Sequence, residues 1–561
     1  MTKILSTTDY EIFKKREGLL KRDGFARLSL WHNAKKFTSD KEVLVSLAST
    51  YYENGAYDKA VDCWFEFLTR TDNKDDIEDA YYGLANCFFK KQNDKICTFY
   101  LNRIFEQSGP LDASMLEDGI VDLISETDEK DRSAYKIVWP PEKVDYFETL
   151  HKARALSLAG ENDEAISLAS EIPEESEYYS HARIEVAFSE FLKGNEKYAV
   201  SVYEEVVEKN PKDITALCHL ANAYYYTFEY DKANACLDKA VELGAKDETE
   251  ETNTFLVACT LIRNDIIIPL AKKALAGKPF SLLHLFAKAI AHYNEGDLIS
   301  AKEGFYKCLC VSPENIAYLY FKNLVDNDIL DGKKGEKHAF SIAEKFPEEL
   351  TEVYKNTVVE LSKINMDRLS SALKSKKNED ALRWAIRYGE PEVNRIAVCI
   401  IAGAKNKWCV EEVKRLLLSC EVPDVLKQLV VTALVTSGYS KKLVVTLGNI
   451  FFRIKIAGLS DGVSDKTLFA YSGCVNALIA IGESETVKFK KSAERLDLIF
   501  GKEVESFSPI ELSALIMLYA GHEKLSAPSV VSKVFLMREK RFNDLKSKAE
   551  KIIEKRNKGE E

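Results

Sequence analysis

A single spacing of about 34 residues, the length of a helix–turn–helix repeat, recurs through much of this 561-residue chain. Small residues mark the spacing, because alanine or glycine returns at the same position of successive blocks. Blocks of this length with small residues at fixed positions are typical of two helices joined by a turn, which stack on one another as an α-solenoid. The sequence therefore predicts an all-α fold with an extended surface. The residues in phase are Ala165, Ala199, Ala233 and Ala301, with Ile267 in the remaining block, and Gly160, Gly194 and Gly296.

The residue types within a block support the same prediction. Alanine or glycine at a helix crossing lets two backbones approach closely, and aromatic residues fill the space between neighbouring blocks. Prolines recur at the end of the second predicted helix, which they stop because a helix interior does not accommodate the missing N–H. These prolines are Pro211, Pro279, Pro313 and Pro347. The clearest block is 180–213, and the next, 214–247, carries Leu217, Leu220, Ala221 and Tyr224, followed by Tyr230, Ala233, Leu237 and Ala240.

These blocks resemble tetratricopeptide repeats (TPRs). The resemblance covers residues 41–111 and 146–349, and it implies a right-handed superhelix in which the first helix of each repeat lines a concave groove. Between these ranges, residues 112–145 keep only Gly119 in phase and contain the acidic sequence ISETDEKDR, so we interpret them as a degenerate repeat or a hinge. Residues 1–40 are interpreted as an N-terminal helical cap.

Helical patterns continue after the regular spacing ends at Glu349. Residues 350–532 are interpreted as a HEAT-like helical region, because CVEEVKRLLLSC and PDVLKQLVVTALVTSG resemble a HEAT-type helical hairpin. Within it, residues 443–456 are rich in β-branched and aromatic residues around Gly448-Asn449, which favours a two-residue turn. We predict a β-hairpin here that packs on the helices. Residues 533–561 are predicted to form an amphipathic helix with ten Lys or Arg against six Asp or Glu.

Composition limits the classes of function. A formal net charge of −11 disfavours a general nucleic-acid binder, which needs an excess of Lys and Arg. No apolar run approaches the length that spans a bilayer, so we expect neither nucleic-acid nor membrane partners. The twelve cysteines are scattered singly, which indicates reduced thiols in a cytoplasmic protein.

Motifs that carry chemistry are missing from the sequence. It contains no HExxH pattern, no Cys-x-x-Cys pair, no Gly-x-x-x-x-Gly-Lys-Ser/Thr loop and no Gly-x-Ser-x-Gly elbow. Acidic pairs are plentiful, as on any solvated helix, and nothing singles out two of them as acid and base. We therefore expect a protein that is not an enzyme and that holds no cofactor or metal.

The resemblance to TPRs implies a candidate partner-binding groove along the first helices of the repeats. One position of these helices is aromatic in five of six repeats, and a neighbouring ring follows it once. Aromatic side chains give a large contact area with little entropy to lose, which suits a groove that grips a peptide. The alternative is that the rings pack against neighbouring helices. The residues are Tyr52, Phe89, Phe191, Tyr225 and Tyr293, with Tyr226 beside Tyr225.

A second position of the same helices holds Asn86 and Asn222. The resemblance implies that an asparagine there grips a peptide backbone or a C-terminal carboxylate, as in chaperone-binding TPRs. Those repeats also need a lysine one turn earlier, where Tyr82 and Cys218 stand in this chain. The sequence therefore does not reproduce the complete carboxylate clamp.

Three functions remain as hypotheses at this point. The favoured one is a non-catalytic scaffold or adaptor that binds a peptide segment or a partner protein in the concave groove. The second is a peptide-responsive TPR regulator, although the segment 1–40 is too short for a complete DNA-binding module. The third is an enzyme with a site near residues 440–470, which predicts a polar pocket with convergent ionisable groups there. The oligomeric state is not predicted.

Overall fold

The fold is known from a computed structural model that describes most of the chain. The described residues are 7–20, 23–109, 111–117, 120, 146–158, 160–173, 176, 178–331, 348–404, 406–484, 486–523, 525–535 and 537–557. Helices dominate, which confirms the predicted all-α fold. Two compact units are present: the central unit, residues 138–347, and the N/C unit, which combines residues 1–137 with residues 348–561.

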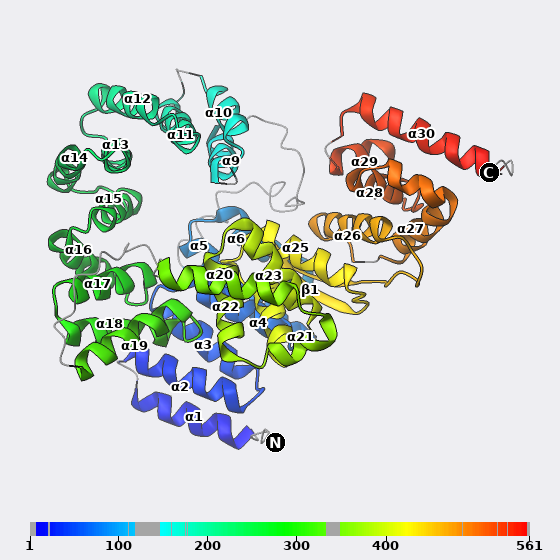
Figure 1. The fold of residues 1–561 in the computed structure, drawn as a ribbon. Coiled ribbons are helices and arrows are strands. Elements are labelled where there is room, and N and C mark those ends of the chain that lie inside the picture. Colours follow the sequence, from blue (N-terminus) through cyan, green and yellow to red (C-terminus); the bar gives the residue numbers. More distant parts are fainter. Residues whose placement is uncertain are drawn as a thin grey trace. The chain divides into compact units, whose positions relative to one another are not determined.

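The central unit is a succession of helix pairs, visible in Figure 1 as the cyan to green coils α9 to α19. The second helices from α10 to α18 begin at residues 162, 196, 230, 264 and 298, which are evenly spaced and repeat the spacing of the small residues. The predicted register is thus present in the fold. The pairs are α9 (Tyr146–Leu158) with α10 (Asn162–Ser170), α11 (Tyr179–Leu192) with α12 (Glu196–Lys209), α13 (Ile214–Tyr226) with α14 (Tyr230–Leu243), α15 (Glu248–Thr260) with α16 (Asn264–Gly277), and α17 (Leu282–Asn294) with α18 (Leu298–Val311), followed by α19 (Ile316–Leu330).

Small residues lie where the paired helices of the central unit cross. Ala187 and Ala221 in the first helices are fully buried, and so are Ala199 and Ala233 in the second helices. A methyl group at each of these points allows close helix packing, which larger side chains would prevent. In α15, Phe255 takes the place of the small residue, and its ring is buried against the imidazole of His284, with the ring centres 4.4 Å apart.

Three helices of the central unit, α13, α15 and α19, begin at a polar capping residue. Asp213, Asp247 and Asn315 each accept a hydrogen bond from a backbone N–H of the first turn of their helix. Such a cap satisfies one of the donors that a helix start leaves unpaired. Each of these three helices therefore has a defined start.

The N/C unit contains two segments that are far apart in the sequence. Its N-terminal segment has paired helices, and its C-terminal segment adds further helices and a two-stranded sheet. The N-terminal elements are α1 (Thr7–Leu19), α2 (Gly24–Phe37), α3 (Glu42–Glu53), α4 (Tyr57–Leu68), α5 (Lys74–Lys90), α6 (Asp94–Ser108) and the 3₁₀ turn η1 (Ala113–Met115). The C-terminal elements are α20 (Glu348–Ser362), α21 (Met366–Ala372), α22 (Lys376–Tyr388), α23 (Pro391–Gly403), α24 (Lys407–Leu418), α25 (Asp424–Thr436), β1 (Lys442–Leu447), β2 (Ile450–Lys455), α26 (Asp465–Ala480), α27 (Val487–Phe500), η2 (Gly501–Ser506), α28 (Pro509–Leu518), α29 (Pro528–Val534) and α30 (Glu539–Asn557).

The predicted β-hairpin is present as strands β1 and β2. The strands pair antiparallel, with Leu447 opposite Ile450. Gly448 and Asn449 form the turn, both with positive φ (55° and 61°), which is the geometry that the Asn-Gly class of turn residues favours. Ile454 is buried on one face of the hairpin. The hairpin therefore confirms the interruption of the helical pattern that the sequence showed.

The opposite face of the hairpin docks on the N-terminal repeats. The ring of Phe451 stacks on Phe65 of α4, with the ring centres 6.3 Å apart. The guanidinium of Arg453 donates hydrogen bonds to the carbonyl oxygens of Leu68 (2.5 Å) and Thr71 (2.9 Å) at the end of α4. At the turn, the buried hydroxyl of Tyr100 donates to the carbonyl oxygen of Asn449 (2.8 Å). Figure 1 shows the blue N-terminal helices and the yellow C-terminal elements side by side.

The loop between α24 and α25 makes a second contact with α4. Asp62 accepts hydrogen bonds from the Ser419 hydroxyl (2.9 Å) and from the Cys420 backbone N–H (2.7 Å). Lys59, one turn earlier, pairs with Glu421 at 2.6 Å. The sequence predicted that the hairpin packs on helices, and the structure identifies α4 and α6 of the first repeats among those helices.

Two further segments were predicted from the sequence, the hinge and the C-terminal helix. Most of the predicted hinge, including residues 121–145, and also Pro347 lie outside the described residues. The predicted C-terminal helix is present as α30, which buries Phe542, Leu545, Ala549 and Ile552 along one face.

We expect Arg453→Ala to lower the free energy of unfolding of the N/C unit by about 1–2 kcal/mol, because two carbonyl oxygens at the end of α4 lose their cationic donor. Urea unfolding followed by circular dichroism measures the change. Lys455→Ala is the matched control, since the side chain of Lys455 is exposed on the same strand, and it should change stability by less than about 0.5 kcal/mol. An Arg453→Ala variant as stable as this control would contradict the docking role of Arg453.

Candidate functional site

The residues of the predicted groove fall into two groups, one in each unit. Tyr52, Asn86 and Phe89 lie on α3 and α5 of the N/C unit, and the others lie on α11, α13 and α17 of the central unit. Each group is described by itself. Within a unit, the candidate residues occupy first helices of the repeats, which are the helices that the TPR resemblance assigns to the groove.

Tyr293 on α17 is part of the core. Its side chain is 1% exposed, and its hydroxyl donates a hydrogen bond to Asp328 of α19 at 2.5 Å. For this residue, packing against neighbouring helices accounts for the aromatic side chain, and we leave it out of the proposed surface.

The other aromatic candidates of the central unit, together with two neighbouring rings, form a continuous cluster. The ring of Phe191 on α11 contacts Tyr226 on α13 (5.6 Å between centres), and Tyr226 contacts Tyr225 (5.3 Å). Tyr225 also contacts Tyr230, the first residue of α14, at 5.6 Å. Phe228, in the turn between α13 and α14, completes the cluster at 6.3 Å from Tyr230. We call Phe191, Tyr225, Tyr226, Phe228 and Tyr230 the aromatic cluster.

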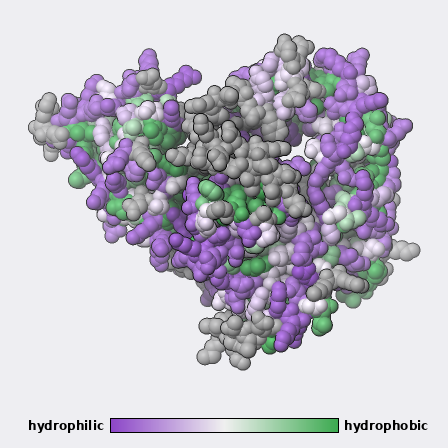
Figure 2. All heavy atoms as spheres, turned by 180° about the vertical axis from the view of Figure 1, so that it is seen from behind, coloured by the Kyte–Doolittle hydropathy of each residue, from purple (hydrophilic) through white to green (hydrophobic). Residues whose placement is uncertain are grey.

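Much of the aromatic cluster is exposed to solvent. Tyr226 is 52% exposed, Tyr230 is 49% exposed and Phe228 is 77% exposed. On the face shown in Figure 2, hydrophilic side chains cover most of the described surface and hydrophobic ones occur in small groups. Neighbouring exposed rings are a typical feature of surfaces that bind proteins.

Phe228 has a strained backbone conformation. The turn between the two helices of each repeat contains one residue with positive φ, and glycine takes this place at Gly160, Gly194 and Gly296. Phe228 and Ile262 stand at the same place, with φ of 65° and 56°. A side chain in this left-handed region costs roughly 1 kcal/mol relative to glycine. Neither Phe228 nor Tyr230 was among the predicted groove residues, although the repeat register places Phe228 at a glycine position.

Asn222 lies one helical turn before Tyr226 on α13. Its amide oxygen is buried and accepts no hydrogen bond from the described residues. Residues four apart share a helix face, so this acceptor lies next to the exposed Tyr226. A bound N–H donor would satisfy it.

The N/C unit contains a different kind of site, in which polar groups of α3 and α5 hold a segment of the same chain. The Asn86 amide nitrogen donates to the carbonyl oxygen of Met115 (2.9 Å), and its amide oxygen accepts from the Glu117 N–H (3.2 Å). The Tyr82 hydroxyl accepts from the Asp112 N–H at 2.7 Å. We call residues 111–117 the resident segment. Phe89 is half-buried on α5.

The carboxylate of Glu117 has two partners in this site. Lys90 of α5 pairs with it at 2.9 Å, and the hydroxyl of Tyr52 donates a hydrogen bond to it. The hydrogen bond from Tyr52 and the ammonium of Lys90 lower the pKa of Glu117, and burial together with the same hydrogen bond raises the pKa of Tyr52. A carboxylate clamp would have a lysine one turn before Asn86, where Tyr82 stands. In the structure, Lys90 lies one turn after Asn86 and supplies the positive charge.

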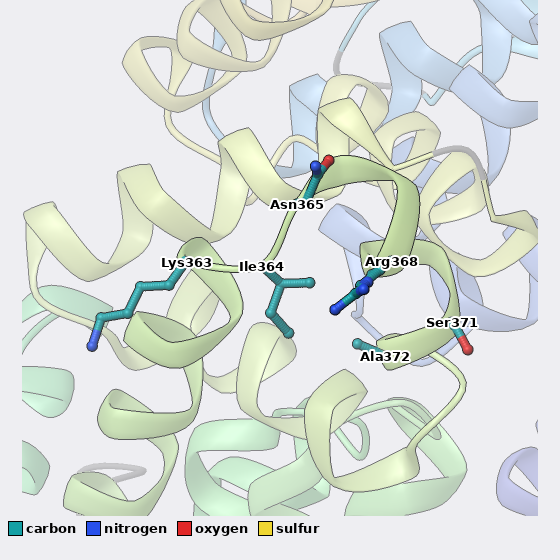
Figure 3. Close-up of a pocket in the computed structure, with 6 residues that line it drawn as sticks. All are labelled: Lys363, Ile364, Asn365, Arg368, Ser371 and Ala372. Carbon is teal, nitrogen blue, oxygen red and sulfur yellow. The ribbon is translucent and has the colours of Figure 1, made fainter.

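A pocket lies at α21, and its lining includes none of residues 440–470, where the enzyme hypothesis predicted a pocket. Its lining residues are Lys363, Ile364, Asn365, Arg368, Ser371 and Ala372. In Figure 3, Ile364 and Arg368 point toward one another, and Lys363 points away from them. The lining contains neither a histidine nor a carboxylate, so it offers no acid–base pair. Over the described ranges, no group of three His, Cys, Asp or Glu side chains is placed to hold a metal ion.

Comparison with known proteins gives similar solved structures, among them the following two. The C-terminal part of a TPR repeat-containing protein from Cytophaga hutchinsonii shares 13% sequence identity, with a TM-score of 0.17, over 55% of this chain and 98% of that chain. Yeast Tom70 shares 14% identity, with a TM-score of 0.19, over 98% of this chain and 97% of that chain. TM-scores this low do not support any inference from these two structures to this chain. Neither a protein-family model nor a curated protein matches the sequence.

In the part that the structure describes, no helix combines the length and apolar character needed to cross a membrane.

The identification of the repeats rests on the helix pattern of this chain itself. Paired helices recur at even spacing in the central unit, with buried alanines at the crossings and a residue of positive φ in each turn. The chain is a TPR-like helical repeat protein.

Proposed function

We propose that this protein is a non-catalytic scaffold or adaptor, and that the aromatic cluster of the central unit binds a partner protein. The observation that carries the proposal is Phe228: a phenylalanine 77% exposed to solvent, in a backbone conformation that costs free energy, at a turn position where Gly160, Gly194 and Gly296 stand in other repeats. Neither the exposure nor the strain stabilises the fold. Strained residues concentrate at binding and catalytic sites, where the interaction with a ligand offsets their cost.

The chemistry of the neighbouring residues indicates the kind of partner. Residues 178–265 contain sixteen Asp or Glu against nine Lys or Arg, and Glu229 and Asp231 directly flank the cluster residue Tyr230. Exposed aromatic rings attract ammonium and guanidinium groups through their π faces. An acidic surface also attracts a cationic partner over longer distances. We therefore propose a partner segment that contains Lys or Arg.

The proposal has a test in which loss of binding is separated from loss of folding. Phe228→Gly should raise the free energy of unfolding by roughly 1 kcal/mol, because glycine relieves the positive φ. The same variant should lose the partner, because the most exposed ring of the aromatic cluster is removed. Quantitative mass spectrometry of proteins recovered from the native cell extract measures binding, and thermal unfolding measures stability.

Ile262→Gly is the matched control. Ile262 has the same position in the turn of the next repeat and a φ of 56°, but it belongs to no aromatic cluster in the described structure. This variant should gain stability and keep the partner. The partner recovered with the wild-type chain should also dissociate as salt rises, since its attraction is partly electrostatic. Equal recovery with Phe228→Gly and with Ile262→Gly would contradict the proposal.

A further inference from the structure

The site on α3 and α5 recognises features that every peptide has. Asn86 contacts a backbone carbonyl and a backbone N–H two positions apart, and Tyr82 contacts another backbone N–H. An asparagine that bonds both groups fixes the backbone of the segment, here the end of the turn η1 (Ala113–Met115), without contacting its side chains. These contacts are therefore open to any segment with the same backbone conformation.

One contact depends on a side chain. The carboxylate of Glu117 takes the hydrogen bond from Tyr52 and the ion pair with Lys90. A charge-assisted hydrogen bond is stronger than a neutral one, so this position selects an acidic residue. Two other side chains of the resident segment face solvent or the segment itself: Met115 is 42% exposed, and the Ser114 hydroxyl donates to Asp112 (2.7 Å).

The ion pair that anchors the resident segment is partly exposed to solvent. The side chains of Lys90 and Glu117 are 36% and 33% exposed, and an ion pair at this exposure contributes little stability. A short segment with one anchoring carboxylate can therefore exchange with a competing peptide. Because the resident segment is part of the same chain, its effective concentration is high, which lowers the apparent affinity of any competitor.

We propose that Tyr52, Tyr82, Asn86 and Lys90 form a binding site for an acidic peptide segment, and that residues 111–117 are its intramolecular occupant, which an external acidic peptide displaces. The site belongs to the N/C unit and does not depend on the aromatic cluster. If this site binds no acidic peptide, the proposed binding of a partner at Phe228 is unaffected. If Phe228 binds no partner, the proposed peptide site is equally unaffected.

Because Glu117 anchors the resident segment, the occupancy of the site should depend on pH. Tyr52 and Lys90 face the Glu117 carboxylate and lower its pKa, so their contribution is present at neutral pH and is lost as pH falls through the folded-state value. Hydrogen exchange of residues 111–117, corrected for the intrinsic rate, should therefore increase on acidification below the ordinary range of a glutamate. In Glu117→Gln, exchange of this segment should already be faster at neutral pH and should increase less on acidification than in wild type, because only Asp112, whose pKa the hydrogen bonds from Ser114 lower, still titrates within the segment. A wild-type segment that responds to pH as this variant does would contradict the role of the carboxylate.

Peptide binding to the full chain tests the displacement directly. The probe is a fluorescent capped peptide with the sequence LDASMLE, which is residues 111–117, and anisotropy measures its dissociation constant. Glu117→Gln weakens the intramolecular occupant and leaves the site residues intact, so it should bind the probe on the order of tenfold more tightly than wild type. Adding Asn86→Ala to that variant should abolish the gain. Glu106→Gln, on the exposed surface of α6, is the control and should bind as wild type does.

A measurement on the wild-type chain completes the test without relying on a variant. Saturating unlabelled LDASMLE peptide should increase hydrogen exchange of residues 111–117, because the segment leaves the site. A peptide with glutamine in place of its final glutamate should have no such effect at the same concentration. Equal probe binding by wild type and Glu117→Gln, or unchanged exchange with saturating peptide, would overturn the proposal.

Discussion

Close packing at alanines is the constraint on which the central unit depends. Ala187, Ala199, Ala221 and Ala233 have no exposed surface, and each lies where two helices meet. Because a solenoid repeat contacts only its neighbours, each crossing must be formed locally and again in the next repeat. The same requirement fixes the length of a repeat, and with it the position of each cap and each turn. The surface residues therefore also recur at fixed positions of the repeat. A substitution in a turn changes the surface but leaves the packing of the repeats in place.

The N/C unit is stabilised by contacts between segments from opposite ends of the chain. Arg453 interacts with the end of α4, and Asp62 of α4 interacts with the loop after α24. The cationic guanidinium at a helix C-terminus offsets the carbonyl groups that the helix leaves unpaired. These contacts join the first repeats to the C-terminal helices in one compact unit, and residues 138–347 form another. A change at the hairpin is therefore expected to affect the first repeats.

Periodicity predicted the fold well because each repeat depends on local packing. The buried alanines, the helix pairs and the Gly448-Asn449 turn all follow from residue types at fixed spacing. The docking of Phe451 and Arg453 did not follow, because a contact between distant segments has no periodic pattern in one sequence. Among the candidate residues, Tyr293 was assigned to the groove by register alone, and its hydrogen bond to Asp328 could not be inferred from spacing. The contacts of Asn86 also depend on the path of residues 111–117, which has no counterpart in the repeat pattern.

The aromatic cluster at Phe228 is the proposed binding surface for a partner protein. Photo-crosslinking in the native cell tests this binding, with Phe228 replaced by p-benzoylphenylalanine and Ile262 replaced in the same way as the matched position. We expect a crosslinked partner with the photoreactive residue at position 228 and a much weaker adduct, or none, at position 262. The reactive ring at 228 keeps an aromatic side chain in the cluster, so binding should survive the replacement. Adducts of equal yield at the two positions, or no adduct at position 228, would contradict the claim.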